Sequence, residues 1–401
     1  MKGVKNLKKI LVVLLLGLMS FSLFAANEAE GVTDDTVKIG CFQALTGPVA
    51  PIGVSMKKGL DAYFNWVNEN GGVNGRAIDF IVADDQFNPS KTVVEVKRMV
   101  EQDNVFAIVG GLGTPGCLAV MDYLNEGGVP FVYQGSGSSL LAVPPKEYIF
   151  TVQPNYLSTE GPIAAKYLVE EKGFDKIAIV YRADDSGKEA LEGFKAWLEA
   201  NGQEDKMVEA LPVDPAATSF DNEIIKLLNS GAEAVYLLMF VPQTPNFIKQ
   251  SADYGYTPLF LGSYPNADPT IIQLAGDASD GFESLAWVDI GDLENPNVQK
   301  YYEIYDESFP GELPNAYAAA GFIAAEVFIE ALERAGEEPT REKLVEALEG
   351  MAGWTGLITP TIAYKPFAED DDTCRVGIRE MYVLKVADGI LAKYYDWIEL
   401  E

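Results

Sequence analysis

The sequence of 401 residues predicts an α/β protein built from two doubly wound lobes, each around a parallel sheet. Two observations lead to this prediction. Apolar strand patterns alternate with helical patterns along the chain, and the alternation resets near residues 149–154 and then begins again. Glycine-rich segments also follow several strand patterns, as expected for the loops that bind ligands at the edge of a parallel sheet.

The chain begins with a predicted signal peptide, residues 1–26. Four lysines precede an apolar run from Ile10 to Phe24, and Ala25-Ala26 offers a cleavage site of small residues. The alternative is an uncleaved membrane anchor, because the run is near the lower limit for spanning a bilayer. No later segment is apolar enough to cross a membrane. We therefore expect an exported protein, periplasmic or otherwise extracytoplasmic.

The first doubly wound unit follows the leader. Its strand patterns and helical stretches alternate, with strands near 37–43, 78–83, 105–109 and 130–133 and helices near 53–70, 90–102 and 115–126. The second unit has a helix near 160–172, then the strand 177–180, a helix near 187–201 and strands near 206–211, 233–239, 258–261 and 281–287.

Two helices are expected after the second unit, near 296–308 and 315–335. In the second of these, apolar residues fall at helical spacing, while Glu326, Glu330 and Glu333 lie on the opposite side. We expect this helix to pack on a sheet through one face only.

A glycine loop, Gly110–Gly116, follows the strand near 105–109. Thr114 is a good helix N-cap and Pro115 suits the first turn, so free backbone N–H groups should face the ligand and favour an anion. Gly111, Gly113 and Gly116 also have the spacing of dinucleotide sites. That match is weak, because the loop follows the third strand and the next strand lacks the expected acid. A purely structural turn is the other alternative.

A second loop, residues 134–139, follows the strand near 130–133. Ser136, Gly137 and Ser138 provide small hydroxyls and a flexible backbone that can approach a ligand closely. The loop lacks the pattern of a hydrolase nucleophile, and the chain has no histidine that could activate a serine.

Composition excludes several function classes. Without the four lysines of the leader, 26 basic and 60 acidic residues leave a net charge of −34, which disfavours nucleic acid and anionic lipid as partners. The absence of histidine removes histidine-based catalysis and typical zinc sites. The three cysteines allow at most one disulfide, and Cys41 fits a core thiol. We expect no enzymatic activity, no metal and no cofactor.

The order of these motifs resembles a known family, the type I periplasmic substrate-binding proteins of ABC importers, in its leucine/isoleucine/valine-binding branch. The resemblance rests on the succession Val37–Gly40, Leu45–Pro48, Asn68–Arg76, Ala83–Asp85 and Ile108–Thr114. It implies two Rossmann-like lobes joined by a three-segment hinge, with residues 35–153 plus 288–365 in the first lobe and 154–287 plus 366–401 in the second.

The resemblance also implies which residues bind the ligand. Family members hold the ligand carboxylate with one hydroxyl residue from each glycine loop, and the matching residues are Thr114 and Ser138, with Ser136 as an alternative to Ser138. The neighbours Leu112, Gly113 and Gly137 complete this predicted carboxylate corner. Better-known family members carry an early disulfide. The positions of its two cysteines correspond to Phe87 and Gly113 in this chain, so the bridge is missing here.

The positions that bind the ligand ammonium group in the family are changed. Amino-acid-binding family members have an acid on the second lobe, and the matching residue in this chain is Tyr264. They also have two tyrosines at this site, and the matching residues here are Ile52 and Ser186. Burying an ammonium group without an anionic partner is costly. Asp184 or Asp185 either supplies the missing charge or is a solvated turn residue.

Aromatic residues surround the predicted cleft, and they suit a hydrophobic or aromatic ligand group. They are Tyr156, Phe240, Tyr264, Trp287 and Phe322.

The resemblance implies a monomeric, extracytoplasmic solute-binding component of an ABC importer, whose partners are a small ligand and the permease subunits. One hypothesis for the ligand is a branched-chain amino acid, an amide or a related carboxylate. The alternative is an aromatic or hydrophobic carboxylate without an amino group. A ligand-sensing domain of the same fold is a third hypothesis, and an exported hydrolase is disfavoured because no nucleophile lies in a cluster with a base.

Overall fold

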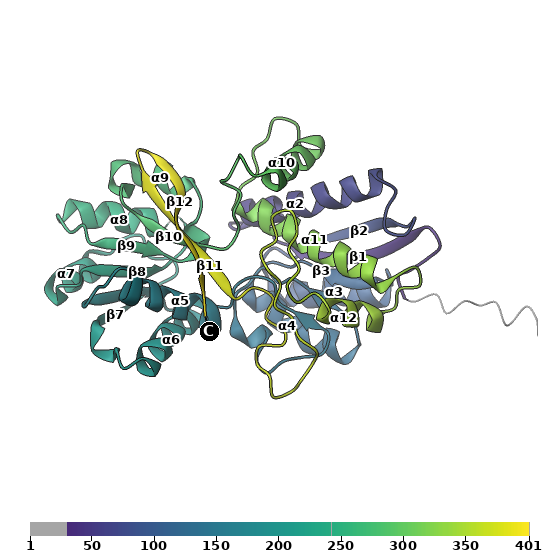
Figure 1. Cartoon of the computed structure of the whole chain (residues 1–401), viewed down its shortest axis with the longest axis horizontal. Helices are drawn as coiled ribbons and strands as arrows, with labels where there is room; N and C mark the ends of the chain where they lie inside the picture. Colours follow the sequence, from purple (N-terminus) through teal and green to yellow (C-terminus); the bar gives the residue numbers. More distant parts are fainter. Residues whose placement is uncertain (1–29, 242, 401) are drawn as a thin grey trace, which may run out of the picture.

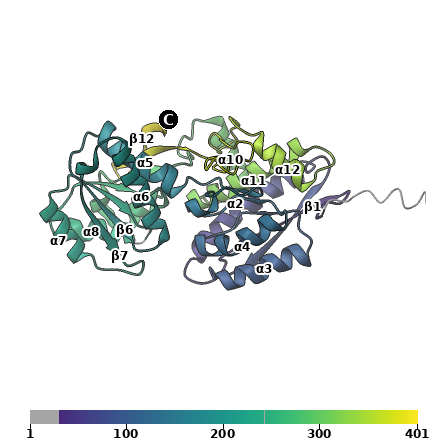
Figure 2. The same ribbon diagram turned by 90° about the horizontal axis from the view of Figure 1, so that it is seen from below.

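The computed structural model describes residues 30–400 apart from residue 242, so the predicted signal peptide lies outside the described residues. Two α/β lobes lie side by side, each with its own sheet and its own helical layers (Figure 1, and from below in Figure 2). The fold class predicted from the sequence is confirmed.

The first lobe contains a parallel sheet of five strands in the order β2-β1-β3-β4-β5. Its strands are β1 (Thr36–Gln43), β2 (Ala77–Asp84), β3 (Ala107–Val109), β4 (Phe131–Val132) and β5 (Ile149–Phe150). The central strands β3 and β4 are buried throughout, because helices cover both faces of the sheet. The short strand β5 was not expected from the sequence pattern.

Helices from two distant parts of the chain cover this sheet. They are α2 (Ala50–Glu69), α3 (Pro89–Glu101), α4 (Thr114–Glu126), α10 (Pro296–Ser308), α11 (Ala316–Ala335) and α12 (Arg341–Glu349). Helix α11 runs beside α2 in Figure 1. A methyl group on Gly321 would lie 2.0 Å from the carbonyl oxygen of Met56, so glycine is required for this close approach.

Helix α11 is buried on nearly all sides, and the expectation that it packs through one face only is wrong. Glu326, which the spacing placed on the outer side, is buried. Its carboxylate accepts hydrogen bonds from the backbone N–H of Leu357 at 2.7 Å and from the hydroxyl of Thr359 at 2.6 Å. A loop from later in the chain therefore covers the side of the helix that was expected to face water.

The second lobe contains a sheet of seven strands in the order β12-β11-β10-β9-β8-β6-β7. The parallel strands are β6 (Ile177–Arg182), β7 (Met207–Val213), β8 (Ala234–Leu238), β9 (Leu259–Gly262) and β10 (Glu283–Ala286). The hairpin of β11 (Glu380–Ala387) and β12 (Ile390–Glu399) adds two antiparallel strands beside β10.

A helical segment begins the second lobe, in which α5 (Gly161–Lys166) is extended by π-helical turns at Tyr156–Glu160 and Tyr167–Glu171. The remaining helices are α6 (Asp185–Ala200), α7 (Asp221–Ser230), α8 (Gln243–Asp253) and α9 (Thr270–Ala275). Single 3₁₀ turns occur at Ser139–Leu141, Glu204–Lys206, Tyr264–Asn266 and Gly276–Ser279. The sequence patterns do not predict α7, α8, α9, α12 or β12.

Three connections cross between the lobes: from β5 to the helical segment at Tyr156, from β10 to α10, and from α12 to β11. The buried Arg375 fixes the last of these against the first lobe. Its guanidinium donates hydrogen bonds to the carbonyl oxygens of Lys146 at 3.1 Å and Glu147 at 2.9 Å, and it pairs with Glu349 at 2.7 Å. Contacts with the first lobe thus continue beyond Pro366, where the resemblance places the start of the second lobe.

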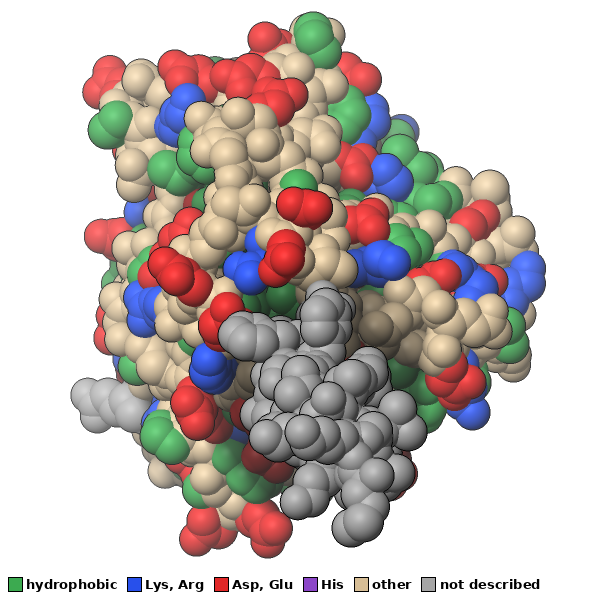
Figure 3. All heavy atoms as spheres, turned by 90° about the vertical axis from the view of Figure 1, so that its right-hand side faces the viewer, with side chains coloured by type: hydrophobic (Ala, Val, Ile, Leu, Met, Phe, Trp, Pro, Cys, Tyr) green, Lys and Arg blue, Asp and Glu red, His purple; other side chains and the backbone are tan. Residues whose placement is uncertain are grey.

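The three cysteines are buried and unbridged. Burial raises the pKa of Cys41 to about 12, so this thiol is a core group, as its strand pattern predicts. Among the helices of the described residues, none is both long and apolar enough to span a bilayer. Figure 3 shows acidic side chains spread across one face of the molecule with fewer basic ones among them, a surface that repels polyanions.

Candidate ligand-binding site

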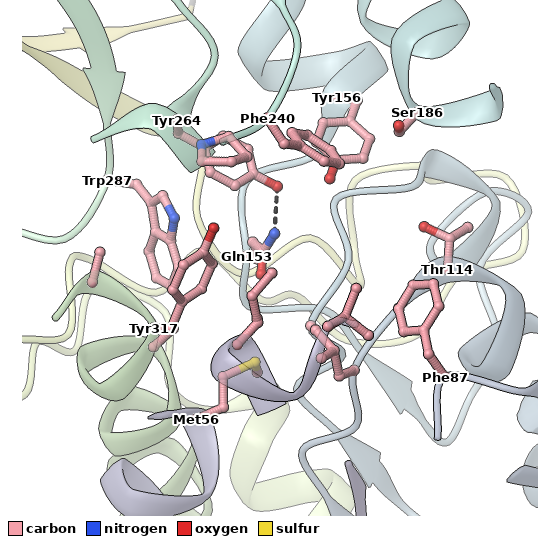
Figure 4. Close-up of a pocket in the computed structure, with 18 of the residues that line it drawn as sticks. Met56, Phe87, Thr114, Gln153, Tyr156, Ser186, Phe240, Tyr264, Trp287 and Tyr317 are labelled. Carbon is pink, nitrogen blue, oxygen red and sulfur yellow. Dashed lines mark hydrogen bonds between the residues drawn. The ribbon is translucent and has the colours of Figure 1, made fainter. Parts of the chain in front are cut away.

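A cavity of about 400 Å³ lies between the two lobes (Figure 4). It is lined from the first lobe by the start of α2, the loop between β3 and α4, and the first turns of α11. The second lobe adds the loops that follow β6, β8, β9 and β10. Ligands bind beyond the carboxyl ends of strands in doubly wound sheets, and the cavity lies in that place.

Nine of the twelve residues predicted from the sequence line this cavity. They are Ile52, Leu112, Gly113, Thr114, Tyr156, Asp185, Ser186, Phe240 and Tyr264. The other three, Ser136, Gly137 and Ser138, are not part of the lining. Their role in ligand binding, like that of the nine, stays a prediction.

Thr114 is the first residue of α4, and the prediction that it is the N-cap is wrong. Gly113 occupies the cap position with a φ of 98°, a left-handed conformation that favours glycine. The Thr114 hydroxyl forms a hydrogen bond of 2.6 Å with the Ser136 hydroxyl instead. The first-turn amides of Thr114 and Gly116 have no partner within the helix, so this end of the cavity still favours an anion.

The Ser138 side chain bonds to the second lobe and does not line the cavity. Its hydroxyl donates to the Glu189 carboxylate at 2.7 Å, and the backbone N–H of Ser139 donates to the other carboxylate oxygen at 2.5 Å. Glu189 belongs to α6 of the second lobe and is buried. Ser138, which was predicted to bind the ligand carboxylate, therefore forms a contact between the lobes in this structure. Its partner Glu189 is distant in the sequence, so local patterns could not indicate this contact.

Phe87 and Gly113 are adjacent, as expected for positions that match a disulfide in relatives. The Phe87 ring lies over Gly113, where a methyl group on the glycine would come within 2.2 Å of a ring carbon. Phe87 also lines the cavity. An aromatic contact thus occupies the place of the missing bridge.

Arg182, at the end of β6, lines the cavity and was missed by sequence reasoning. Its Nε donates to the Asp184 carboxylate at 2.8 Å, and its guanidinium lies 4.3 Å from the centre of the Phe240 ring. The sequence pattern predicts a strand that ends at residue 180, whereas β6 continues to Arg182. The available sequence signal for a binding residue was an arginine at the end of a strand in a strongly acidic chain.

Asp184 is committed to its own lobe. Its carboxylate caps α6, accepting from the backbone N–H of Gly187 at 3.2 Å and from the Ser186 hydroxyl at 2.7 Å. Burial opposes ionisation, but the bonds from Ser186 and Arg182 outweigh it and lower the pKa of Asp184. Two acids are among the described lining residues, Asp184 and Asp185. Asp184 pairs with Arg182, whereas the exposed Asp185 has no cationic partner among the described residues.

The wall opposite Thr114 is made of neutral aromatic groups (Figure 4). The Tyr264 hydroxyl accepts a hydrogen bond from Gln153 Nε2, and its ring stacks on Tyr156 with 5.8 Å between centroids. Trp287 and Tyr317 stand beside it. Phe322 is not part of the site, because it is fully buried and packs against Tyr63 and Tyr301.

Glu160 lies behind this wall. It is fully buried, and its carboxylate accepts a hydrogen bond of 3.2 Å from the backbone N–H of Tyr264. Burial raises the pKa of Glu160 to about 7, and it does the same for Glu326 in the first lobe.

These two carboxyls predict a pH dependence of stability. Between about pH 4.5 and 7 the two carboxyls stay protonated in the folded protein. In the unfolded chain their pKa values are near 4.5, so they have lost their protons in the same pH range. Their contribution to the free energy of unfolding is therefore greatest below pH 4.5 and falls as pH rises toward 7. A Glu160→Gln/Glu326→Gln variant should show a shallower fall in urea unfolding between about pH 5 and 7. Glu330→Gln, a change at a half-buried glutamate of α11 that pairs with Arg334, is the control. A double variant whose free energy of unfolding falls as steeply with pH as that of the parent would contradict the prediction.

Two α/β lobes, joined by three connections and enclosing a cavity, have the architecture of a two-lobed binding protein. Residues 36–389 match the family model described as "Periplasmic binding protein". The chain belongs to this family, and the resemblance inferred from the sequence motifs is confirmed.

Similar proteins include the leucine-, isoleucine-, valine-, threonine-, and alanine-binding protein of Pseudomonas aeruginosa, 25% identical over 349 residues, which are 86% of this chain and 89% of that protein. Among solved structures, a fatty acid ABC transporter substrate-binding protein from Thermomonospora curvata has a TM-score of 0.78 at 24% identity, covering 94% of this chain and 95% of that one. A solute-binding protein from R. palustris in complex with benzoate has a TM-score of 0.75 at 18% identity, covering 91% and 98%. The two structures support the fold.

Proposed function

We propose that this protein is the extracytoplasmic solute-binding component of an ABC importer, and that its ligand is a small carboxylate with a hydrophobic body and no ammonium group. The ligand binds between the lobes, the lobes close over it, and the permease subunits recognise the closed form. The protein acts as a monomer and performs no reaction.

The observation that carries this proposal is Arg182, a cation at a cavity whose lining is mostly aliphatic and aromatic. Two of the guanidinium nitrogens face Asp184, and the group lies over the Phe240 ring, which fixes its plane. Arginine binds carboxylates through charge-assisted hydrogen bonds, which are about twice as strong as neutral ones. The amides at the start of α4 favour the same charge from the first lobe.

An ammonium group would lack a suitable partner at the inner wall. Tyr264 stands where amino-acid-binding relatives are expected to have an acid, and its oxygen already accepts from Gln153. Asp184 is neutralised by Arg182. A buried ammonium group without a carboxylate partner costs several kcal/mol, on the order of the whole binding energy of a weak ligand.

The body of the ligand is expected to be hydrophobic or aromatic. Aliphatic and aromatic side chains form most of the lining, among them Ile52, Met56, Leu112, Leu118 and Trp287. A cavity of about 400 Å³ has the size of typical small-molecule sites. The names of two similar structures, one for fatty acids and one with benzoate, agree with this chemical class.

An aliphatic amino acid is the second candidate ligand. It is favoured by the exposed Asp185 on the cavity lining, which is able to meet an ammonium group after closure, and by the name of the Pseudomonas aeruginosa relative. Removing this charge in an Asp185→Asn variant would then abolish binding of the amino acid.

Thermal shift of the mature protein tests the proposal. The probes are leucine, valine and phenylalanine beside benzoate and hexanoate. A ligand that binds only the native state adds about 2.7 kcal/mol at 100 times its dissociation constant, which raises the melting temperature visibly. We expect stabilisation by at least one of the two acids. Stabilisation by amino acids alone would support the second candidate, and no shift with any probe would contradict both.

A further inference from the structure

We propose that the ligand carries a second oxygen function, a hydroxyl or a carbonyl, at the end remote from its carboxylate, and that Tyr264, Tyr317 and Trp287 bind this oxygen. This inference rests on the proposed function, because it assumes a carboxylate at the Thr114 and Arg182 side of the cavity. The three aromatic residues are called the donor wall below.

The donor wall is assembled from both lobes. Tyr264 follows β9 and Trp287 follows β10 in the second lobe, whereas Tyr317 lies in the first turn of α11 in the first lobe. In Figure 4 the Tyr317 hydroxyl and the Trp287 indole nitrogen point toward the space beside Tyr264, and Thr114 and Phe87 stand on the far side of the cavity. Trp287 and Tyr264 are only 6% and 7% exposed.

The wall offers hydrogen-bond donors. Gln153 Nε2 donates to the Tyr264 oxygen, and the Tyr156 hydroxyl is a second hydrogen-bond partner of Tyr264. An indole N–H is a donor only. Burial raises the pKa of Tyr317 to about 12 and keeps its hydroxyl protonated. Among the described residues, the Tyr317 hydroxyl and the Trp287 Nε1 make no hydrogen bond to another protein group.

Donors that a bound ligand shields from water select an acceptor. A ligand that ends in an alkyl group would cover these donors and leave them unpaired, which weakens binding. An ammonium group, itself a donor only, cannot pair with the Trp287 N–H. A hydroxyl or carbonyl oxygen can accept from two donors at once. The donor wall thus explains why a neutral tyrosine is suitable at the position of Tyr264.

The inference is tested by calorimetric titration with matched pairs of acids: benzoate and 4-hydroxybenzoate, and the unbranched acids of four to eight carbons beside their ω-hydroxy derivatives. In at least one pair the oxygenated acid should bind about 5- to 50-fold more tightly, the gain expected from one or two neutral hydrogen bonds. For that pair, Tyr317→Phe and Tyr264→Phe should each weaken the oxygenated acid about 2- to 10-fold more than the parent acid. Tyr254→Phe, an exposed change in the turn after α8, is the control.

Two outcomes would overturn the inference: parent acids that bind as tightly as every oxygenated partner, or tyrosine variants that weaken both members of a pair equally. Failure of the proposed function looks different, because then no acid of either kind binds. Since each phenylalanine keeps its ring, the ratio within a pair remains readable even where a variant lowers overall stability. The two variants alter different lobes, so each checks the other.

Discussion

An Arg182→Met variant is expected to bind hydrophobic carboxylates about 10- to 100-fold more weakly than the parent protein, the equivalent of one strong charge-assisted contact. Methionine keeps an unbranched stem beside the Phe240 ring but removes the charge and the donors. Asp184 would still cap α6 through Gly187 and Ser186, so the fold of the second lobe should persist. The measurement is calorimetric titration with benzoate or hexanoate, whichever gives the larger thermal shift.

Lys188→Met is the matched control for Arg182. It removes the same charge from an exposed position on α6, outside the cavity lining. The control should retain affinity within a factor of two, because exposed charges contribute little to a distant contact in salt. Unchanged affinity in the Arg182 variant would show that the carboxylate binds without the arginine.

The second large effect concerns stability. Arg375→Met should lower the free energy of unfolding by about 3–5 kcal/mol, because it removes a fully buried guanidinium and leaves its partly buried partners unsatisfied. Those partners are three backbone carbonyls and the Glu349 carboxylate, and they join the last connection between the lobes to the first lobe. Urea unfolding followed by circular dichroism gives the measurement.

Two further variants keep this prediction testable if Arg375→Met fails to fold. Arg375→Lys retains the charge but not the planar fork of donors, and an intermediate loss is expected. Arg379→Met, a half-buried arginine four residues later, should cost about 1 kcal/mol or less. Equal losses at the two arginines would show that the hydrogen bonds of Arg375 are not what stabilises this connection.

The strands and loops that position the site were predictable from local sequence. Apolar runs such as 105–109 and 177–180 are short, rich in valine and isoleucine and bounded by other patterns, which favours buried strands over helices. The glycine loop at 110–113 follows from left-handed backbone conformations that glycine adopts easily. The resemblance then placed Ile52, Ser186 and Tyr264, all of which line the cavity.

The parts that could not be predicted depend on contacts between distant segments. Ser138 was expected to face a ligand, but its hydroxyl bonds to Glu189 of the other lobe. Glu326 was expected to face water, but the segment at 357–359 covers it. Strand β12 was missed because its alternation is weak and its residues are largely exposed. Local periodicity carries no information about such partners.

The most direct test of the central claim compares leucine with 4-methylpentanoate, which is leucine without its amino group, and phenylalanine with 3-phenylpropanoate. Calorimetric titration of the mature protein should give a dissociation constant at least about tenfold lower for the acid in one of the pairs, since an unpaired ammonium group costs more than 1.4 kcal/mol. Tighter binding of leucine or phenylalanine than of the corresponding acid would contradict the claim that the site excludes an ammonium group.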